Sequence, residues 1–287
     1  MLKQNAKIAV IAPAGIPNLD GLQAGEQFVR SLGYDIVRLP HVGERYRFTA
    51  GRPEARTADL RLALESPDID AVWLARGGYG SVHCLPGLKE AGLDGRPIIG
   101  CSDATALFTA LQKTRGGHLI HGPMLETIAT RVDDLTRSRI TAMLAGEALP
   151  AIPATHLCGP DSKTTGRILG GNLCVLASLA GTPWALSAKD AIVVLEDVTE
   201  KPYRIDRLIT QLRFSGALDG ALAIALGDFV QCDPPPEADY TLEDILRDAL
   251  APLNIPVWWR LPLGHDKRNL AFRVGALGTL GPDGLAQ

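Results

Sequence analysis

The sequence lacks the features that would place it among nucleic-acid-binding or membrane-spanning proteins. Its formal net charge at pH 7 is −3, so no basic excess favours a nucleic acid or an anionic membrane as a partner. No window approaches about 18 uninterrupted apolar residues, the length that suggests a transmembrane helix. The N-terminus has no long apolar segment followed by a small-residue cleavage site, so we expect a cytoplasmic protein without a membrane partner.

Cysteine pairs and cofactor motifs are also missing. The five cysteines are odd in number, scattered and free of CxxC spacing, which is typical of reduced cytosolic thiols and indicates neither a disulfide framework nor a zinc site. Neither G-x-G-x-x-G nor G-x-x-x-x-G-K-[ST] occurs in the glycine-rich part of the chain, so nucleotide binding has no motif behind it. With 46% hydrophobic and 21% charged residues, the chain has the composition of a globular protein.

Apolar segments alternate with helical patterns through the first half of the chain. Short apolar runs bounded by glycine or proline predict strands, and apolar residues at helical spacing predict helices. The predicted strands cover residues 8–12, 34–40, 69–76, 97–100 and 118–121, and the predicted helices cover 21–32, 52–66, 104–113 and 132–145. This alternation is typical of a doubly wound, mostly parallel sheet, which belongs to the α/β fold class.

The pattern lapses between residues 146 and 165, where glycine, proline and small polar residues gather. We interpret this stretch as a linker or a crossover between domains. Further strands are predicted at 191–197, 222–227, 255–263 and 270–280, with helices ending near 179, beginning near 203 and covering 241–250. The chain is thus divided into an N-terminal domain over 1–147, a linker over 148–165 and a smaller mixed α/β domain over 166–287.

Two loops fall at the carboxyl ends of neighbouring predicted strands, where doubly wound sheets bind their ligands. One is Arg-Gly-Gly-Tyr-Gly at 76–80, and the other is Gly-Cys-Ser-Asp at 100–103. The glycines either let backbone N–H groups approach a ligand or simply form a turn. Ser102 is either a helix N-cap or a nucleophile held at the end of the sheet. Because Ala104 occupies the last position, the G-x-S-x-G pattern of the α/β hydrolases is not met.

Two titratable groups in the second half lie at the ends of apolar runs. Glu196 ends a strand of the buried type, where a carboxylate is costly unless it is paired. Its structural alternative is a helix cap or an ion pair with Arg204 or Arg207. His265 follows an apolar run and lies in a turn, where a single histidine is more often structural than catalytic. His118 and His121 lie three positions apart on a predicted strand. Because successive side chains point to opposite faces of a strand, these two histidines do not form a chelating face.

Eight segments resemble, in their order along the chain, the motifs of the LD-carboxypeptidases, a family that includes muramoyltetrapeptide carboxypeptidase and the microcin C immunity peptidases. The resemblance extends from Ile8 to about Gly281. The segments are Ala75-Arg76-Gly77-Gly78-Tyr79-Gly80-Ser81, Gly100-Cys101-Ser102-Asp103-Ala104-Thr105, His121-Gly122-Pro123-Met124, Gly170-Gly171-Asn172-Leu173, Gly181-Thr182-Pro183-Trp184, Val194-Leu195-Glu196-Asp197, Pro202-Tyr203-Arg204-Ile205-Asp206-Arg207 and Gly264-His265.

The resemblance implies a serine peptidase without a metal or cofactor. The family's nucleophile falls on Ser102, its general base on His265 and its orienting glutamate on Glu196. The backbone amides of Gly78 and Asp103 are similar in position to the family's oxyanion-hole donors. A serine needs such a base to become a nucleophile, and the carboxylate fixes the tautomer of the imidazole.

The resemblance further implies a Rossmann-like N-terminal domain and a smaller C-terminal domain, with the triad assembled across the two and the chain forming a homodimer. An arginine such as Arg76 or Arg204 would suit a substrate carboxylate. We also expect Tyr79, beside Arg76, to contact the substrate.

Three functional hypotheses remain. The first is a carboxypeptidase that releases terminal D-alanine from murein tetrapeptides in peptidoglycan recycling. The second is a self-immunity peptidase that cleaves peptidyl or aminoacyl nucleotides, and the third is a binding module for a small phosphorylated or carboxylated molecule. The chain has Arg-Val-Gly at 273–275 where the family often has Pro-Leu-Gly, and it is short for the microcin-type members. The shorter chain favours the peptidoglycan-recycling branch.

Overall fold

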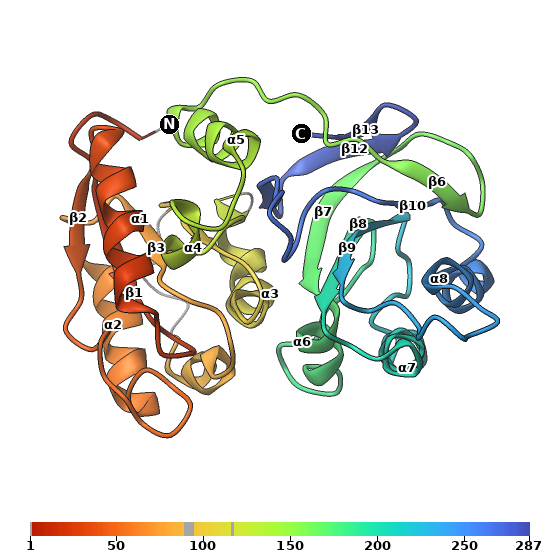
Figure 1. The fold of residues 1–287 in the computed structure, drawn as a ribbon, viewed down its shortest axis with the longest axis horizontal. Coiled ribbons are helices and arrows are strands. Elements are labelled where there is room, and N and C mark those ends of the chain that lie inside the picture. Colours follow the sequence, from red (N-terminus) through yellow and green to blue (C-terminus); the bar gives the residue numbers. More distant parts are fainter. Residues whose placement is uncertain (1, 89–94, 116–117) are drawn as a thin grey trace.

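The computed structural model describes residues 2–88, 95–115 and 118–287. Two lobes lie side by side, each built on its own β-sheet, and the last strands of the chain run between them (Figure 1). None of the helices in the described ranges is long and apolar enough to cross a bilayer. The predicted mixed α/β fold is confirmed.

The first lobe contains the predicted doubly wound sheet, with strand order β11-β5-β4-β3-β1-β2. Its strands from the first half of the chain pair in parallel, and β11 pairs antiparallel with β5. The strands are β1 (Lys7–Ile11), β2 (Asp35–Arg38), β3 (Ala71–Leu74), β4 (Ile98–Gly100), β5 (Leu119–His121) and β11 (Phe272–Val274). The helices are α1 (Leu19–Ser31), α2 (Pro53–Glu65), α3 (Ala104–Arg115), α4 (Leu125–Ile128) and α5 (Asp134–Ala145), with a 3-10 helix, η1, at Ser81–Gly87.

Alternation along the strands sends apolar side chains to both faces of this sheet. Ala9 and Ile11 of β1 pack with α2 and α3, whereas Ile8 and Val10 pack with α1, α4 and α5. Helices therefore cover both faces. This explains why the strands read as continuous apolar runs rather than as alternating ones.

The second lobe is built on a mixed sheet with strand order β13-β12-β7-β8-β9-β10-β6. Its centre, from β7 to β10, is parallel, and its outer pairs are antiparallel. The strands are β6 (Thr155–Cys158), β7 (Thr164–Asn172), β8 (Ala191–Val198), β9 (Ala223–Val230), β10 (Val257–Trp259), β12 (Leu277–Gly281) and β13 (Gly284–Ala286). The helices are α6 (Leu173–Ser178), α7 (Pro202–Phe214) and α8 (Leu242–Leu250), with a second 3-10 helix, η2, at Ala251–Leu253.

One hydrophobic core joins the two sheets through α3. Leu107 and Phe108 of α3 are fully buried in the same cluster as Ile168 of β7 and Val194 of β8. The opposite face of the second sheet packs on α6, α7 and α8 in a separate cluster. Helix α3 is thus enclosed between the two sheets, which fixes the position of its N-terminus relative to both.

The chain crosses between the lobes more often than the predicted division suggests. Strand β6 lies inside the stretch 148–165 that was predicted as a linker, and it forms the edge of the second sheet. Strand β11 lies within 166–287 but extends the first sheet through its pairing with β5. Membership in the two sheets therefore does not follow one cut in the sequence, because an edge strand can come from any segment that reaches an unpaired neighbour.

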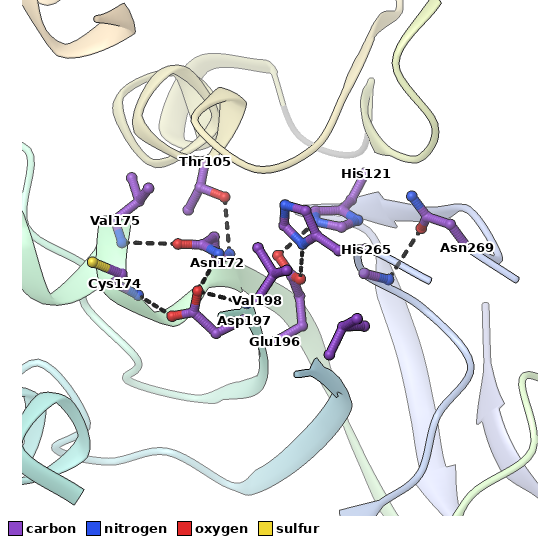
Figure 2. A network of polar contacts seen from close by, with 12 residues as sticks. Thr105, His121, Asn172, Cys174, Val175, Glu196, Asp197, Val198, His265 and Asn269 are labelled. Carbon is purple, nitrogen blue, oxygen red and sulfur yellow. Dashed lines mark hydrogen bonds and ion pairs between the residues drawn. The ribbon is translucent and has the colours of Figure 1, made fainter. Parts of the chain in front are cut away.

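A buried hydrogen bond connects α3 to the second sheet. The backbone N–H of Asn172 donates to Thr105 Oγ1 at 3.0 Å, while the Asn172 side chain donates to Asp197 Oδ1 at 3.0 Å and accepts from Val175 N (Figure 2). A Cβ at Gly171 would lie 2.5 Å from Thr105 Oγ1, so only glycine permits this approach. The φ of +143° at Gly171 also requires glycine.

We expect Thr105→Val to lower the free energy of unfolding by about 1–3 kcal/mol, because it leaves the buried N–H of Asn172 without an acceptor. Denaturant unfolding measures this. Thr109→Val is the matched control, since the Thr109 hydroxyl donates to the Thr105 carbonyl within α3. An equal loss in the two variants would contradict the proposed importance of the contact between the lobes.

Candidate active site

Ser102 lies on a sharp turn between β4 and α3. Its φ is +59°, a left-handed conformation that is uncommon for a residue other than glycine and is often found at functional sites. A Cβ on the preceding Gly100 would lie 2.8 Å from Leu74 and 3.1 Å from Ala104, so the turn has no room for a larger residue there. The turn itself is closed by Thr105 N donating to the Ser102 carbonyl at 2.9 Å.

The structure does not support Ser102 as the N-cap of α3. The residue before the helix is Asp103, and its buried carboxylate turns away from α3 to accept from Ser81 N at 2.8 Å and from Ser81 Oγ at 2.5 Å. Burial raises the pKa of Asp103, and the bonds from Ser81 counteract that rise. Asp103 therefore ties the serine turn to the glycine-rich loop that precedes η1.

The glycine-rich loop lies directly against the serine. A Cβ at Gly77 would lie 2.8 Å from Ser102 Cβ and 3.0 Å from its Oγ, and Gly78 has a φ of +100°. The loop is held from behind by Gly15 N, which donates to the Gly77 carbonyl at 2.9 Å. It is also held by the buried Arg56, whose guanidinium donates to the carbonyls of Pro13 and Gly80.

The amides predicted for an oxyanion hole both belong to these two turns. Within the described ranges, the backbone N–H groups of Gly78 and Asp103 donate to no protein acceptor. Unpaired backbone N–H groups next to a serine can stabilise negative charge that develops on a substrate oxygen.

The second lobe supplies a buried carboxylate and a histidine in direct contact. His265 Nδ1 lies 2.6 Å from Glu196 Oε2, and Glu196 is fully buried at the end of β8 (Figure 2). Glycines make the approach possible, because a Cβ at Gly264 would lie 2.7 Å from Glu196 Oε2, and one at Gly227 would lie 3.0 Å from Glu196 Cβ. Asn269 Oδ1 accepts from Gly264 N at 3.2 Å and so fixes the turn that carries the histidine.

This contact sets the protonation of both groups. Burial alone would raise the pKa of Glu196, but the neighbouring charge of His265 and the two nearby imidazoles hold it at about 2. Burial would lower the pKa of His265, and the Glu196 carboxylate outweighs that effect and raises it. Glu196 is therefore ionised throughout the neutral range, and His265 is a stronger base than a free histidine.

A second histidine lies on the other side of Glu196. His121 is fully buried at the end of β5, with its Nε2 at 3.7 Å from Glu196 Oε1 and its ring stacked on Phe272 of β11 at 4.8 Å between centroids. His121 belongs to one of the eight family-like segments, but its place beside Glu196 was not predicted. The sequence indicates that His121 lies at the carboxyl end of β5, the strand next to β4. The structure adds that this end of β5 lies close to Glu196 of β8.

One pocket brings the predicted residues of the two lobes together. Its volume is about 580 Å³, and Ser102, Gly78, Arg76 and His265 all line it. Glu196 lies behind His265 and is closed off from solvent. The group of acidic, cysteine and histidine residues that a metal would need is absent from the described part of the chain.

The predicted substrate contacts divide into two kinds. Arg76 lines the pocket, but its guanidinium already donates to the Ile16 carbonyl at 3.0 Å and lies 3.7 Å from Glu126. Tyr79 and Arg204 lie outside the residues that line the pocket: Tyr79 packs on Phe48 and His83, and Arg204 pairs with Glu200 at 2.5 Å. Two further cations, Arg131 and Lys267, line the pocket and were not predicted from the sequence.

Two family models together match most of the chain. A model of the LD-carboxypeptidase N-terminal domain matches residues 8–122, and a model of the C-terminal domain of the same family matches residues 165–280. The chain therefore belongs to the LD-carboxypeptidase family. The resemblance read from the sequence motifs is confirmed.

Individual relatives agree with this assignment. The chain is 36% identical to the murein tetrapeptide carboxypeptidase of Pseudomonas aeruginosa, over 96% of this chain and 93% of the relative. It is 31% identical to the crystal structure of muramoyltetrapeptide carboxypeptidase from Oxalobacter formigenes, with a TM-score of 0.82 over 96% of this chain and 94% of the other. The microcin C7 self immunity protein MccF, in complex with aspartyl sulfamoyl adenosine, has a TM-score of 0.87 over 98% and 95% of the two chains. At 21% identity that likeness shows the shared fold alone.

We expect Gly77→Ala to lower kcat/KM for peptide hydrolysis roughly 10²-fold, because the new methyl group would displace Ser102 and a misplacement of about 1 Å has that effect. Steady-state kinetics on a peptide substrate measures this. Gly43→Ala is the control, since a Cβ there meets no atom within 4 Å. Full activity of Gly77→Ala would show that the loop does not constrain the serine.

Proposed function

We propose that the protein is a serine-type LD-carboxypeptidase with Ser102, His265 and Glu196 as its catalytic triad. The observation that supports this most strongly is the 2.6 Å contact between Glu196 and His265, since His265 lines the same pocket as Ser102. Since Nδ1 of His265 faces the carboxylate, Nε2 is the nitrogen left to take the serine proton. A binding module would not need a strained serine, a buried carboxylate and a histidine around one pocket.

The proposed reaction proceeds through an acyl-enzyme. Ser102 Oγ attacks the scissile carbonyl carbon while His265 takes its proton, and the backbone N–H groups of Gly78 and Asp103 stabilise the tetrahedral oxyanion. The C–N bond then breaks, and His265 gives the proton to the leaving amine. In the second half, His265 removes a proton from water, which attacks the ester and regenerates Ser102. Removing one oxyanion-hole donor typically costs about 3–4 kcal/mol of transition-state stabilisation.

The substrate we propose is a murein tetrapeptide, from which the enzyme releases terminal D-alanine during peptidoglycan recycling. The names of the relatives at 36% and 31% identity support this assignment. A pocket of about 580 Å³ is within the size range of small-ligand sites, which suits the end of a short peptide. The immunity-peptidase hypothesis has the support of the shared fold at 21% identity and no observation that favours it further.

We also propose that the enzyme acts in the cytoplasm as a homodimer. The free thiols of all five cysteines suit a reducing compartment. The homodimer is proposed from the family resemblance, and the peptide is the only other partner we propose.

The native protein should release D-alanine from a murein tetrapeptide, and Ser102→Ala should reduce that rate at least about 10³-fold, because no other group replaces the nucleophile. D-alanine release is followed by a coupled amino-acid oxidase assay. The variant should unfold at a temperature close to that of the native protein. Failure of the native protein to cleave the tetrapeptide, together with hydrolysis of an aminoacyl sulfamoyl adenosine, would replace this proposal with the immunity-peptidase function.

Arg131 should contribute to recognition of a substrate carboxylate. It lines the pocket, and its positive charge acts on His265, whose imidazole must lie near the leaving group. We expect Arg131→Gln to reduce kcat/KM by about 10- to 100-fold for a tetrapeptide with a free C-terminal carboxylate, and to leave kcat/KM for the C-terminal amide nearly unchanged.

Arg137→Gln is the matched control for Arg131→Gln. Its guanidinium donates to the Val132 carbonyl and pairs with Asp134 outside the pocket, so it should not discriminate between the acid and the amide. An equal effect of Arg131→Gln on both substrates would assign Arg131 to general steering rather than to carboxylate recognition.

A further inference from the structure

The proposed mechanism uses only one oxygen of the Glu196 carboxylate. Oε2 contacts His265, whereas Oε1 is buried and has no hydrogen-bond partner among the described residues. Both ring nitrogens of His121 are also buried without a partner in the described part of the chain. Three polar atoms without partners thus lie together next to the triad, and buried polar atoms of this kind are rare enough to require an explanation.

The two groups are almost close enough to satisfy each other. His121 Nε2 and Glu196 Oε1 are 3.7 Å apart, whereas a charge-assisted N–H···O bond measures about 2.7–2.9 Å. Both side chains are fully buried, so water does not compete for either atom from an open surface. A movement of about 1 Å closes the gap, and the gain is large because a buried carboxylate oxygen without a hydrogen bond is costly in the interior.

The surroundings of His121 hold its ring in the plane that this bond needs. Phe272 stacks on the imidazole at 4.8 Å with an interplanar angle of 20°, and β11 brings Phe272 there through its pairing with β5. In the register of that pair, Phe272 lies opposite His121. The stack covers one face of the ring. The edge of the ring that carries Nε2 is directed at Glu196 (Figure 2).

We infer that His121 is a positioning residue for the triad, whose Nε2–H donates to Glu196 Oε1 while His265 binds Oε2, so that the carboxylate is held between two imidazoles. This inference rests on the proposed peptidase function, because it assigns His121 a role in tuning the base of that reaction. It extends the triad into a chain that runs from β5 through β8 to the turn after β10.

A donor on Oε1 affects His265 through the shared carboxylate. A hydrogen bond to Oε1 stabilises part of the negative charge of Glu196. The carboxylate then attracts the protonated imidazole of His265 less strongly. Without that donor the carboxylate stabilises the imidazolium more strongly, so the pKa of His265 rises. Because only the neutral imidazole can act as base, the acid limb of kcat/KM then moves to higher pH.

Other titratable groups act on this network from neighbouring elements. Burial raises the pKa of Asp197 on β8 to about 6 and the pKa of Asp228 on β9 to about 7. Asp266 acts on Asp228, and Arg131 acts on His265 from the pocket side. The Cys101 thiol stays neutral, because burial raises its pKa to about 12. Asp228 is therefore the group that could be mistaken for His265 in a titration near neutrality.

The test compares His121→Phe with His121→Gln. Phenylalanine keeps the flat ring against Phe272 but cannot donate, whereas the glutamine amide can place a donor near the position of Nε2. We expect His121→Phe to raise the acid-limb pKa of kcat/KM by about one unit, and His121→Gln to restore most of the native value. Titration of the His265 imidazole by NMR, assigned by the signal lost in His265→Gln, should show the same order without any substrate.

Each outcome decides the inference. A rise of the His265 pKa in His121→Phe that persists in an Asp228→Asn background, and is reversed in His121→Gln, supports it. If kcat/KM falls equally at all pH values while the NMR titration of His265 does not move, His121 only fills space and the inference is overturned. The NMR titration also separates the two proposals, because it remains informative if the native protein releases no D-alanine and the proposed function fails.

Discussion

Burial of the Glu196 carboxylate is the constraint on which the arrangement of the site depends. An ionised group without access to water needs partners, and the structure supplies one imidazole at 2.6 Å and another at 3.7 Å. Each partner comes from a different part of the chain: His265 from the turn after β10 and His121 from the end of β5. The two imidazoles beside this one carboxylate therefore come from both lobes and meet next to the pocket.

Helix α3 holds the turn that contains Ser102 between the two lobes. It is enclosed between the two sheets, and the turn at its N-terminus holds Ser102 in a left-handed conformation. Such a conformation persists only where the surroundings determine it, and here Asp103, Gly77 and Thr105 each fix the turn from a different direction. The strain at Ser102 is thus stabilised by packing that also connects the lobes.

The sequence predicts the parallel strands and both site loops because these depend on local patterns. The apolar run 97–100 followed at once by a helical pattern identified the turn at Ser102, and the motif around Glu196 identified the carboxylate. The roles of His121 and Asn269 could not be predicted in this way. His121 depends on Glu196, which lies more than 70 residues further along the chain. Asn269 depends on the conformation of the turn at Gly264, which the sequence does not reveal. The same limit applies to β11, which joins the first sheet from the far end of the chain.

In the proposed mechanism, the two lobes together activate Ser102 as a nucleophile. The most direct measurement is the intact mass of the protein after treatment with a serine-directed acylating probe, followed by peptide mapping of the adduct. We expect one adduct per chain, located on Ser102 and much slower to form in His265→Gln. A folded native protein that forms no adduct, or one that is labelled on another serine, would contradict it.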